Sequence, residues 1–159
     1  NTVLYGATGG RFYAAGYAGE RFCVRNSGAV AVVEGVGDHA CEYMTGGEVY
    51  IFGPVGKNLG AGMSGGLAYI LVENKNIEHQ INHDMVFIEK VNSKDIKKIE
   101  NSLSEHYSLT KSRKAERILD NFKNFTSKFI KVVPKEIFNL LESKGISIDD
   151  FDFVNPKLN

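Results

Sequence analysis

Two short stretches of the sequence carry residue types and spacings that could support chemistry. Residues 60–65 read Gly-Ala-Gly-Met-Ser-Gly, which matches the G-x-G-x-x-G pattern of a dinucleotide-binding loop. Residues 38–42 read Asp-His-Ala-Cys-Glu, so two carboxylates, an imidazole and a thiol lie close together, as a metal site or a thiol nucleophile would need. The elements that position these residues decide whether either stretch is functional.

The glycine loop lacks the flanking elements that give its pattern a mechanism. A dinucleotide-binding loop follows a buried strand and opens a helix whose first amides face the pyrophosphate. Here the turn-forming residues 53–59 precede Gly60, and the strand-forming run 66–72 follows Gly65. We therefore interpret these glycines as structural, and we expect this chain to bind neither a pyridine nucleotide nor FMN.

The polar stretch is also explained without a ligand. On a strand, His39 and Cys41 share one face, whereas Asp38 and Glu42 do not join them. Asp38 is expected to accept bonds from amides at a corner of the chain, and His39 to meet a neighbouring domain. Cys23 and Cys41 form no C-x-x-C pair, so we expect buried free thiols and no metal site.

The overall composition excludes some classes of partner. The 159 residues include 19 basic and 19 acidic residues, and the formal net charge is zero. This balance gives no reason to expect nucleic acid or an anionic membrane surface as a partner. No apolar run approaches the roughly twenty residues of a membrane span, and no signal sequence opens the chain, so we expect a cytoplasmic protein.

Composition also divides the chain into two parts. Sixteen of the 17 glycines lie within residues 6–66, whereas only nine charged residues occur within residues 1–72. Four marker glycines, each opening a run of residues that favours a strand, recur at intervals of 18, 19 and 19 residues: Gly10, Gly28, Gly47 and Gly66. Such a period indicates stacked units that bury one another's apolar faces.

A repeat of about 19 residues with glycine corners predicts a parallel β-helix, because it leaves room only for short strands. We interpret the four marker glycines as the structural corners of this coil. The second and fourth positions after each marker are apolar and predict the inward face: Phe12 and Ala14, Val30 and Val32, Val49 and Ile51, and Ala68 and Ile70. The outward positions should be covered by a second layer because several are apolar, namely Tyr50, Phe52, Tyr69 and Leu71.

The second part of the chain is predicted to be helical. Periodic apolar residues indicate helices over 94–103, with Ser93 as a possible cap, and over about 112–125, with Thr110 or Ser112 as its cap. A third helix is expected to start at Pro134 and to stop at Gly145. These amphipathic helices can supply the layer that the outer face of the coil requires.

The remaining segments complete the expected organisation. Residues 2–5 and 85–88 are strand-like, and the acidic segment 149–152 is expected to be mobile. The predicted boundaries are a β-helix domain over 1–74, a connecting segment with a strand over 75–91, and a helical C-terminal extension over 92–159. Because Asn1 is followed directly by a strand-like run, we interpret the chain as a piece of something longer.

Three groups of residues in the first part resemble a known family. They are Gly-Glu-Arg-Phe at 19–22 with Val-Arg-Asn-Ser-Gly-Ala at 24–29, the run 32–39 with 41–47, and the run 62–66 with Ala68-Tyr69. Over about residues 1–72 the sequence closely resembles the C-terminal glycine-repeat domain, or GXGXG domain, of the glutamate synthase large (alpha) subunit. The G-x-x-G-x-x-x-G spacing of that domain is present at Gly53, Gly56 and Gly60.

The resemblance implies a right-handed parallel β-helix within an oxidoreductase of nitrogen assimilation, which makes glutamate from glutamine and 2-oxoglutarate. It further implies that an amidotransferase domain with an N-terminal cysteine and a barrel carrying FMN and a 3Fe-4S cluster perform the chemistry. The glycine-repeat domain would brace these two domains. We therefore assign no catalytic, cofactor-binding or metal-binding residue here, and expect interdomain contacts at Arg25, Asn26, Asp38 and His39.

Other interpretations stay open at this point. A related glycine-repeat domain occurs in a formylmethanofuran dehydrogenase subunit, and a free-standing β-helix scaffold is a third possibility. Relative to the glutamate synthase pattern, the sequence starts partway through the coil. We therefore expect the piece on its own to be inactive and to pair end to end with itself. The sequence does not indicate whether the electron donor of the parent enzyme is NADPH, NADH or ferredoxin.

Overall fold

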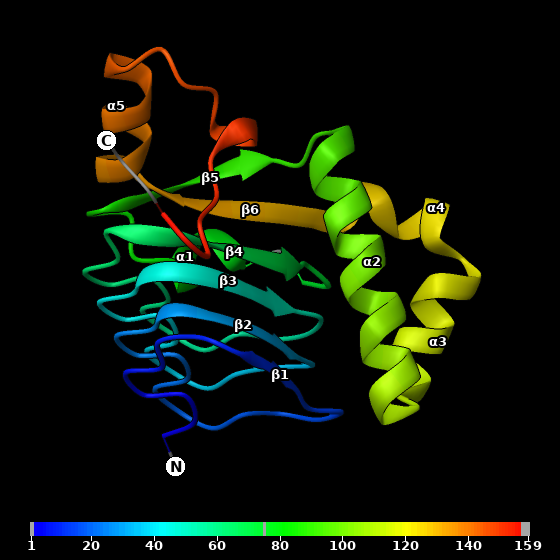
Figure 1. Cartoon of the computed structure of the whole chain (residues 1–159). Helices are drawn as coiled ribbons and strands as arrows, with labels where there is room; N and C mark the ends of the chain where they lie inside the picture. The colour runs from blue at the N-terminus through cyan, green and yellow to red at the C-terminus, as the bar shows by residue number, and fades with distance from the viewer. Residues whose placement is uncertain (1, 75, 157–159) are drawn as a thin grey trace.

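Figure 1 shows the computed structural model of the chain, which describes residues 2–74 and 76–156. One six-stranded sheet has the order β1-β2-β3-β4-β6-β5, with strands β1 (Arg11–Tyr13), β2 (Ser27–Val33), β3 (Thr45–Ile51), β4 (Gly65–Leu71), β5 (Val86–Lys90) and β6 (Phe129–Pro134). The helices are α1 (Ile77–Gln80), α2 (Ser93–Thr110), α3 (Arg113–Asp120), α4 (Phe122–Phe125) and α5 (Lys135–Ser143). Two short 3-10 helices are η1 (Thr126–Lys128) and η2 (Ile148–Asp150).

The first four strands form a β-solenoid, which confirms the predicted fold. Strands β1 to β4 pair in parallel, each with the next along the chain. Together they make about three turns at about 19 residues per turn. Figure 1 shows these turns stacked from β1 at the bottom to β4, with α2, α3 and α4 standing beside them.

The inward face of the coil agrees with the prediction in β1, β3 and β4 but not in β2. Side chains of Val49, Ile51, Ala68 and Ile70 lie in the core inside the coil. In β2, however, the inward residues are Ala31 and Val33, whereas the predicted Val30 and Val32 belong to the core outside the coil. The registers Ala31↔Val49 and Val33↔Ile51 fix this arrangement.

A β-bulge explains the error in β2. The register passes from Ser27↔Gly46 to Val30↔Glu48, so two residues of β2 lie opposite the single residue Gly47. Beyond the bulge, Ala29 rather than Gly28 is in step with Gly47. Counting from Gly28 therefore turned every later side chain of the strand to the wrong face.

The four marker glycines lie where each turn of the coil enters its strand. Gly10, Gly47 and Gly66 have φ values of 86°, 94° and 79°, which strain a residue with a side chain. Gly28 has no positive φ, but a Cβ atom there would lie 2.5 Å from the carbonyl oxygen of Thr8 in the preceding turn. Close approach between turns thus requires glycine at this position.

The predicted second layer covers the outer face of the coil. The outward side chains Tyr50, Phe52, Tyr69 and Leu71 are at most 2% exposed and share one apolar core with residues of α2 and α3, including Ile99, Leu103, Ala115 and Ile118. The rings of Tyr50 and Tyr69 stack at 5.1 Å across adjacent strands. The helical part therefore completes the coil rather than forming a separate core.

The upper end of the sheet differs from the parallel part. Strand β5 occupies the strand-like region that the sequence predicts. Strand β6, which the sequence analysis did not predict, pairs antiparallel with both β4 and β5. Its run Phe-Ile-Lys-Val-Val is rich in strand-forming residues. Because the run lies between two helical patterns, the whole region was predicted to be helical.

The cap of one helix differs by one residue from the predicted cap. The N-cap of α2 is Asn92 rather than Ser93, because Asn92 and Asp95 form a reciprocal capping box. Of the two predicted caps, Thr110 and Ser112, it is Ser112 that caps α3, and Pro134 precedes α5, as predicted. The stretch 112–125 is not one helix, since it breaks at Asn121 into α3 and α4. No helix within the described part of the chain is long and apolar enough to cross a membrane.

The two ends of the described chain were predicted to be a strand and a mobile acidic segment. Residues 2–5 form no strand, and Leu4 has a left-handed φ of 60°. In the segment 149–152 the three aspartates are exposed, but Phe151 packs on the outer core together with Phe153, which is 2% exposed. The aromatic residues beside the acids explain this, because their burial holds the segment in place.

A buried charged network fixes α2 on the outer face of the sheet. Lys131 Nζ on β6 lies 2.8 Å from Asp95 on α2, and Tyr69 donates a hydrogen bond of 2.7 Å to the same carboxylate. Burial by itself raises the pKa of Asp95, but hydrogen bonds from Lys131, the Asn92 backbone and Tyr69 outweigh it, so the pKa lies below the ordinary 3.8. Lys98 on the same helix pairs with Glu48 of β3.

Replacing Ile51 by Asp is expected to unfold the coil. Ile51 is fully buried between Val33 and Ile70, and an unpaired carboxylate there should cost about 4 kcal/mol or more. The control Glu48→Asp should cost only about 1 kcal/mol, because Glu48 faces outward and keeps its charge, so that the change disturbs its pairing with Lys98 and the hydrogen bond from Tyr50 without burying a new carboxylate. Thermal unfolding followed by circular dichroism compares the two variants. Equal melting temperatures would show that the inward face is wrongly assigned.

Replacing Asp95 by Asn is expected to destabilise the protein by about 3 kcal/mol at pH 7, since it leaves the Lys131 ammonium buried and unpaired. Because folding lowers the Asp95 pKa, its contribution is present above the unfolded-state pKa and disappears as the pH falls through the folded value. Urea unfolding at pH 7, 5 and 3 should therefore give a difference between variant and parent that shrinks toward pH 3. The exposed control Asp120→Asn should change little. A difference independent of pH would contradict the role given to this carboxylate.

Candidate functional site

The side of the coil opposite the strands has a left-handed backbone. Eight non-glycine residues there have φ between 55° and 65°: Leu4, Arg21, Cys23, Arg25, His39, Cys41, Tyr43 and Asn58. They occupy every second position within a turn and recur 18 or 19 residues later in the next turn. We call these eight residues, with Gly60 and Gly62 of the top turn, the left-handed ladder. Each non-glycine member stores about 1 kcal/mol or more of backbone strain.

Backbone hydrogen bonds between turns hold the ladder in this conformation. The amides of Arg21 and Arg25 donate to the next turn, to the carbonyls of Asp38 at 2.8 Å and Glu42 at 2.9 Å. The amide of Cys41 donates in the opposite direction, to Phe22 at 2.8 Å. Because bonds run both up and down, each turn is fixed by its two neighbours. The ladder is therefore a rigid surface despite its strain.

Three of the four predicted contact residues lie on or beside this ladder. Arg25 is exposed and its guanidinium lies 5.9 Å from the centre of the Tyr43 ring. Nδ1 of His39 lies 3.1 Å from the carboxylate of Glu42, and about a third of the His39 side chain is exposed. Asp38 accepts a hydrogen bond of 2.7 Å from the amide of Lys57, which confirms its predicted bond to a corner amide.

Asn26, the fourth residue, is fully buried. Its side-chain oxygen accepts from the amide of Ala29 at 2.9 Å and of Gly28 at 3.2 Å, and its nitrogen donates to the carbonyl of Ala29 at 3.1 Å. The side chain thus supports the β2 bulge from inside. It does not reach the surface where a neighbouring domain could meet it.

The two cysteines are free and buried, as predicted. Their side chains point from the ladder into the core of the coil. Burial raises the pKa of Cys41 to about 12, and burial together with the nearby Cys41 raises that of Cys23. Both thiols are therefore protonated near neutral pH and are poor nucleophiles.

The G-x-G-x-x-G stretch belongs to the coil, as its flanking residues predict. Gly60 and Gly62 lie on the ladder with φ of 80° and 66°. A strand, β4, begins at Gly65, where a dinucleotide-binding loop would open a helix. Within residues 2–74 and 76–156, no group of three or more His, Cys, Asp or Glu side chains could hold a metal ion.

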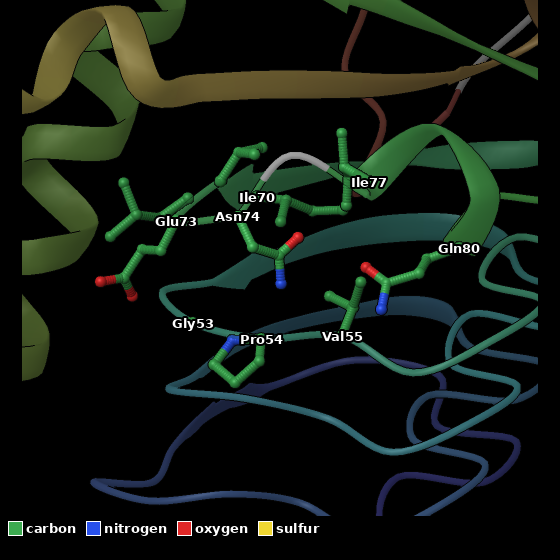
Figure 2. A pocket seen from close by; sticks show the side chains of 10 residues that line it. Gly53, Pro54, Val55, Ile70, Glu73, Asn74, Ile77 and Gln80 are labelled. Carbon is green, nitrogen blue, oxygen red and sulfur yellow. The ribbon is translucent and has the colours of Figure 1, made fainter.

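One pocket lies at the top of the coil between the corner at Pro54 and helix α1. Figure 2 shows the side chains around it, with the amides of Asn74 and Gln80 directed toward its centre. The pocket has a volume of about 140 Å³ and its walls are mainly aliphatic, including Val55, Ile70 and Ile77. Glu73 is the ionisable residue among the described lining, and it pairs with Lys114 at 2.8 Å. This lining offers no acid–base pair for catalysis.

Comparisons with known proteins agree with the sequence resemblance. The model of the GXGXG motif family matches residues 1–135. The glutamate synthase [NADPH] large chain of Bacillus subtilis is 50% identical over 145 residues, which cover 90% of this chain and 10% of that protein. The ferredoxin-dependent glutamate synthase of Antithamnion sp. is 50% identical over 135 residues, covering 84% of this chain and 9% of that protein.

The name of a third relative includes NADH, whereas the names of the first two include NADPH and ferredoxin. The glutamate synthase [NADH] of Schizosaccharomyces pombe is 49% identical over 146 residues, covering 91% of this chain and 7% of that protein. The chain thus spans about a tenth or less of the length of these relatives. By the family model and by these identities, the chain belongs to the GXGXG motif family and corresponds to a small segment of the glutamate synthases that it matches.

Proposed function

We propose that this chain is a structural, interdomain-bracing part of a glutamate synthase, the enzyme that makes glutamate from glutamine and 2-oxoglutarate, and that it is not itself catalytic. The observation that carries the proposal is the rigid left-handed ladder, whose residues Arg21, Arg25, Tyr43 and Asn58 are exposed. The sheet face of the coil is covered by the chain's own helices, whereas the ladder faces away from them. A surface fixed by bonds in two directions is suited to hold another domain at a set distance.

The chemistry of the described residues supports a passive role. Both thiols are buried and protonated, and the pocket at α1 is lined by aliphatic side chains and amides. The glycine loop is part of the coil. We accordingly propose that FMN, the iron–sulfur cluster and the catalytic cysteine belong to other parts of the parent enzyme, and that this segment holds no cofactor.

The proposed partners are the amidotransferase and FMN-binding domains of the same parent enzyme, in the cytoplasm. The relatives are about ten times longer than the matched segment, so such domains have ample chain to come from. Arg25, Asp38 and His39 are the proposed contacts, and Tyr43, a residue that is 54% exposed, extends the same surface. Aromatic and arginine residues that a partner buries are common anchors of protein interfaces. The names of the relatives favour this assignment over a formylmethanofuran dehydrogenase subunit or a free-standing scaffold.

Co-expression of this chain with the remaining segments of the parent glutamate synthase tests the proposal. The untagged segments should co-purify with the tagged chain, and Arg25→Glu should weaken their association at least about tenfold, equivalent to about 1.4 kcal/mol. The control Arg113→Glu makes the same charge change on an exposed residue of the helical layer and should have no effect. Co-purification that is equal for both variants would exclude the ladder as the contact surface. Glutamate formation by the isolated chain would exclude a passive role.

The isolated chain is expected to associate with itself through the free edge of β1. The bonds from Val30 to Gly10 and from Ala14 to Val32 direct alternate residues of this strand toward β2, so Arg11 and Tyr13 present their backbone groups at the edge. Sedimentation velocity over a hundredfold concentration range should show a rising average mass. Arg11→Pro removes one edge donor and should reduce this association. An unchanging monomer would show that the edge is already protected.

A further inference from the structure

Residues 147–154, near the end of the described chain, cross the outer face of the sheet, and we call them the strap. Figure 1 shows it as the red segment that descends from η2 past β6 toward the stacked strands. Its path is fixed at β3, where the amide of Gly47 donates a hydrogen bond of 2.7 Å to the carbonyl of Phe153. The family model ends at residue 135, so the strap lies outside the part that defines the family.

The strap crosses the coil at glycines of the bulged strands. A Cβ atom at Gly46 would lie 3.4 Å from the carbonyl oxygen of Phe153, and one at Gly28 would lie 3.4 Å from that of Val154. The strap backbone thus passes at contact distance over two turns of the coil. We call this strip of bare glycine backbone, at Gly28, Gly46 and Gly47, the groove, because the extended strap lies along it.

Phe153 anchors the strap in this groove. Its side chain is 2% exposed and belongs to the core outside the coil. The ring of Phe151 meets it edge-on, with centroids 4.8 Å apart. Burial of one phenylalanine with a second ring against it is the principal apolar contact of the segment.

The polar contacts of the strap are exposed and therefore weak. Asn92 donates to both carboxylate oxygens of Asp149, at 2.9 and 3.1 Å, and Lys94 lies 3.6 Å from Asp150. The Lys94 and Asp150 side chains are 65% and 69% exposed, so their ion pair contributes little. These contacts nevertheless pair the acidic strap with the N-terminal end of α2, which carries the Asn92 amide and the Lys94 ammonium group.

We propose that the groove over Gly28, Gly46 and Gly47 is a binding site for an extended acidic peptide with phenylalanine anchors, and that the strap is its dissociable occupant. Within the described residues a single backbone hydrogen bond joins the strap to the coil. The turns of the coil, in contrast, are joined by continuous ladders of such bonds. The strap therefore opens at a lower free energy than the coil unfolds. This inference does not depend on the bracing function.

Hydrogen exchange of the Gly47 amide in the full chain tests the proposal, because that amide reports directly on the bond to Phe153. In the Phe153→Ala variant, Gly47 should exchange at least tenfold faster, while the amide of Val49 in the same strand exchanges at its original rate. The control Phe122→Ala removes a half-buried phenylalanine of α4, which packs against Phe129 away from the strap, and should leave Gly47 unchanged. Joint acceleration of Gly47 and Val49 in Phe153→Ala would overturn the proposal, since the strap would then open only with the coil.

A rescue experiment tests the binding site itself. A synthetic peptide of residues 146–156, added in excess to the Phe153→Ala chain, should restore the slow exchange of Gly47. The same peptide carrying the Phe153→Ala change should not restore it. Failure of the parent peptide to slow the exchange at millimolar concentration would overturn the proposal that the groove accepts such a segment from solution.

Discussion

The structure depends on one constraint, which is that the strands of the coil are apolar on both faces. In β4 every residue is buried, and in β2 all but the first. Stacking of turns buries the inward side chains, but nothing in the coil itself can bury Tyr50, Phe52 and Tyr69. The second half of the chain meets this need, since α2 and α3 lay their apolar stripes on that face. Coil and helices are therefore parts of one folded unit, and neither has a complete core alone.

Attachment of the helical layer also has a specific polar component. The ion pair of Asp95 and Lys131 joins the capping turn of α2 to β6, and Tyr69 joins both to the coil. A buried pair of this kind contributes little net stability, yet it penalises any arrangement that separates its members. Because Asp95 also closes the capping box with Asn92, the same carboxylate sets where the helix starts and where it lies.

Glycine serves three different purposes in this coil. Positive φ requires it at Gly47 and Gly66, and close approach of the preceding turn requires it at Gly28. Together the glycines also leave the sheet bare where the strap crosses. On the opposite side, non-glycine residues such as Arg25 and Tyr43 accept left-handed strain instead, and they carry the exposed side chains of the ladder. Strain held at an exposed, rigid surface is common where proteins make functional contacts, which is consistent with the bracing role proposed for this face.

The sequence by itself determined the repeat, the solenoid, the need for an outer layer and the helices that supply it. These features rest on periodicity and composition, which are local properties that the chain displays without its fold. It also indicated that the G-x-G-x-x-G stretch and the cysteines are parts of a coil, because their flanking residues and spacing are visible in one dimension. The family resemblance came from the same residues.

Only the tertiary structure decided which residues point inward in β2, that β6 lies between β4 and β5 in the sheet, and that the strap is docked. Each depends on partners distant in the chain. The β2 bulge exists because Gly47 faces two residues of the strand below, which counting along one strand cannot reveal. The sequence does not distinguish Asn26 from an exposed asparagine, because it is the bulge that buries its side chain. In the sequence, Phe153 follows an acidic segment and gives no sign of burial. Only the fold places the backbone of its segment against the glycines of β2 and β3. Register and burial are relations between segments, so they are settled only when the segments meet.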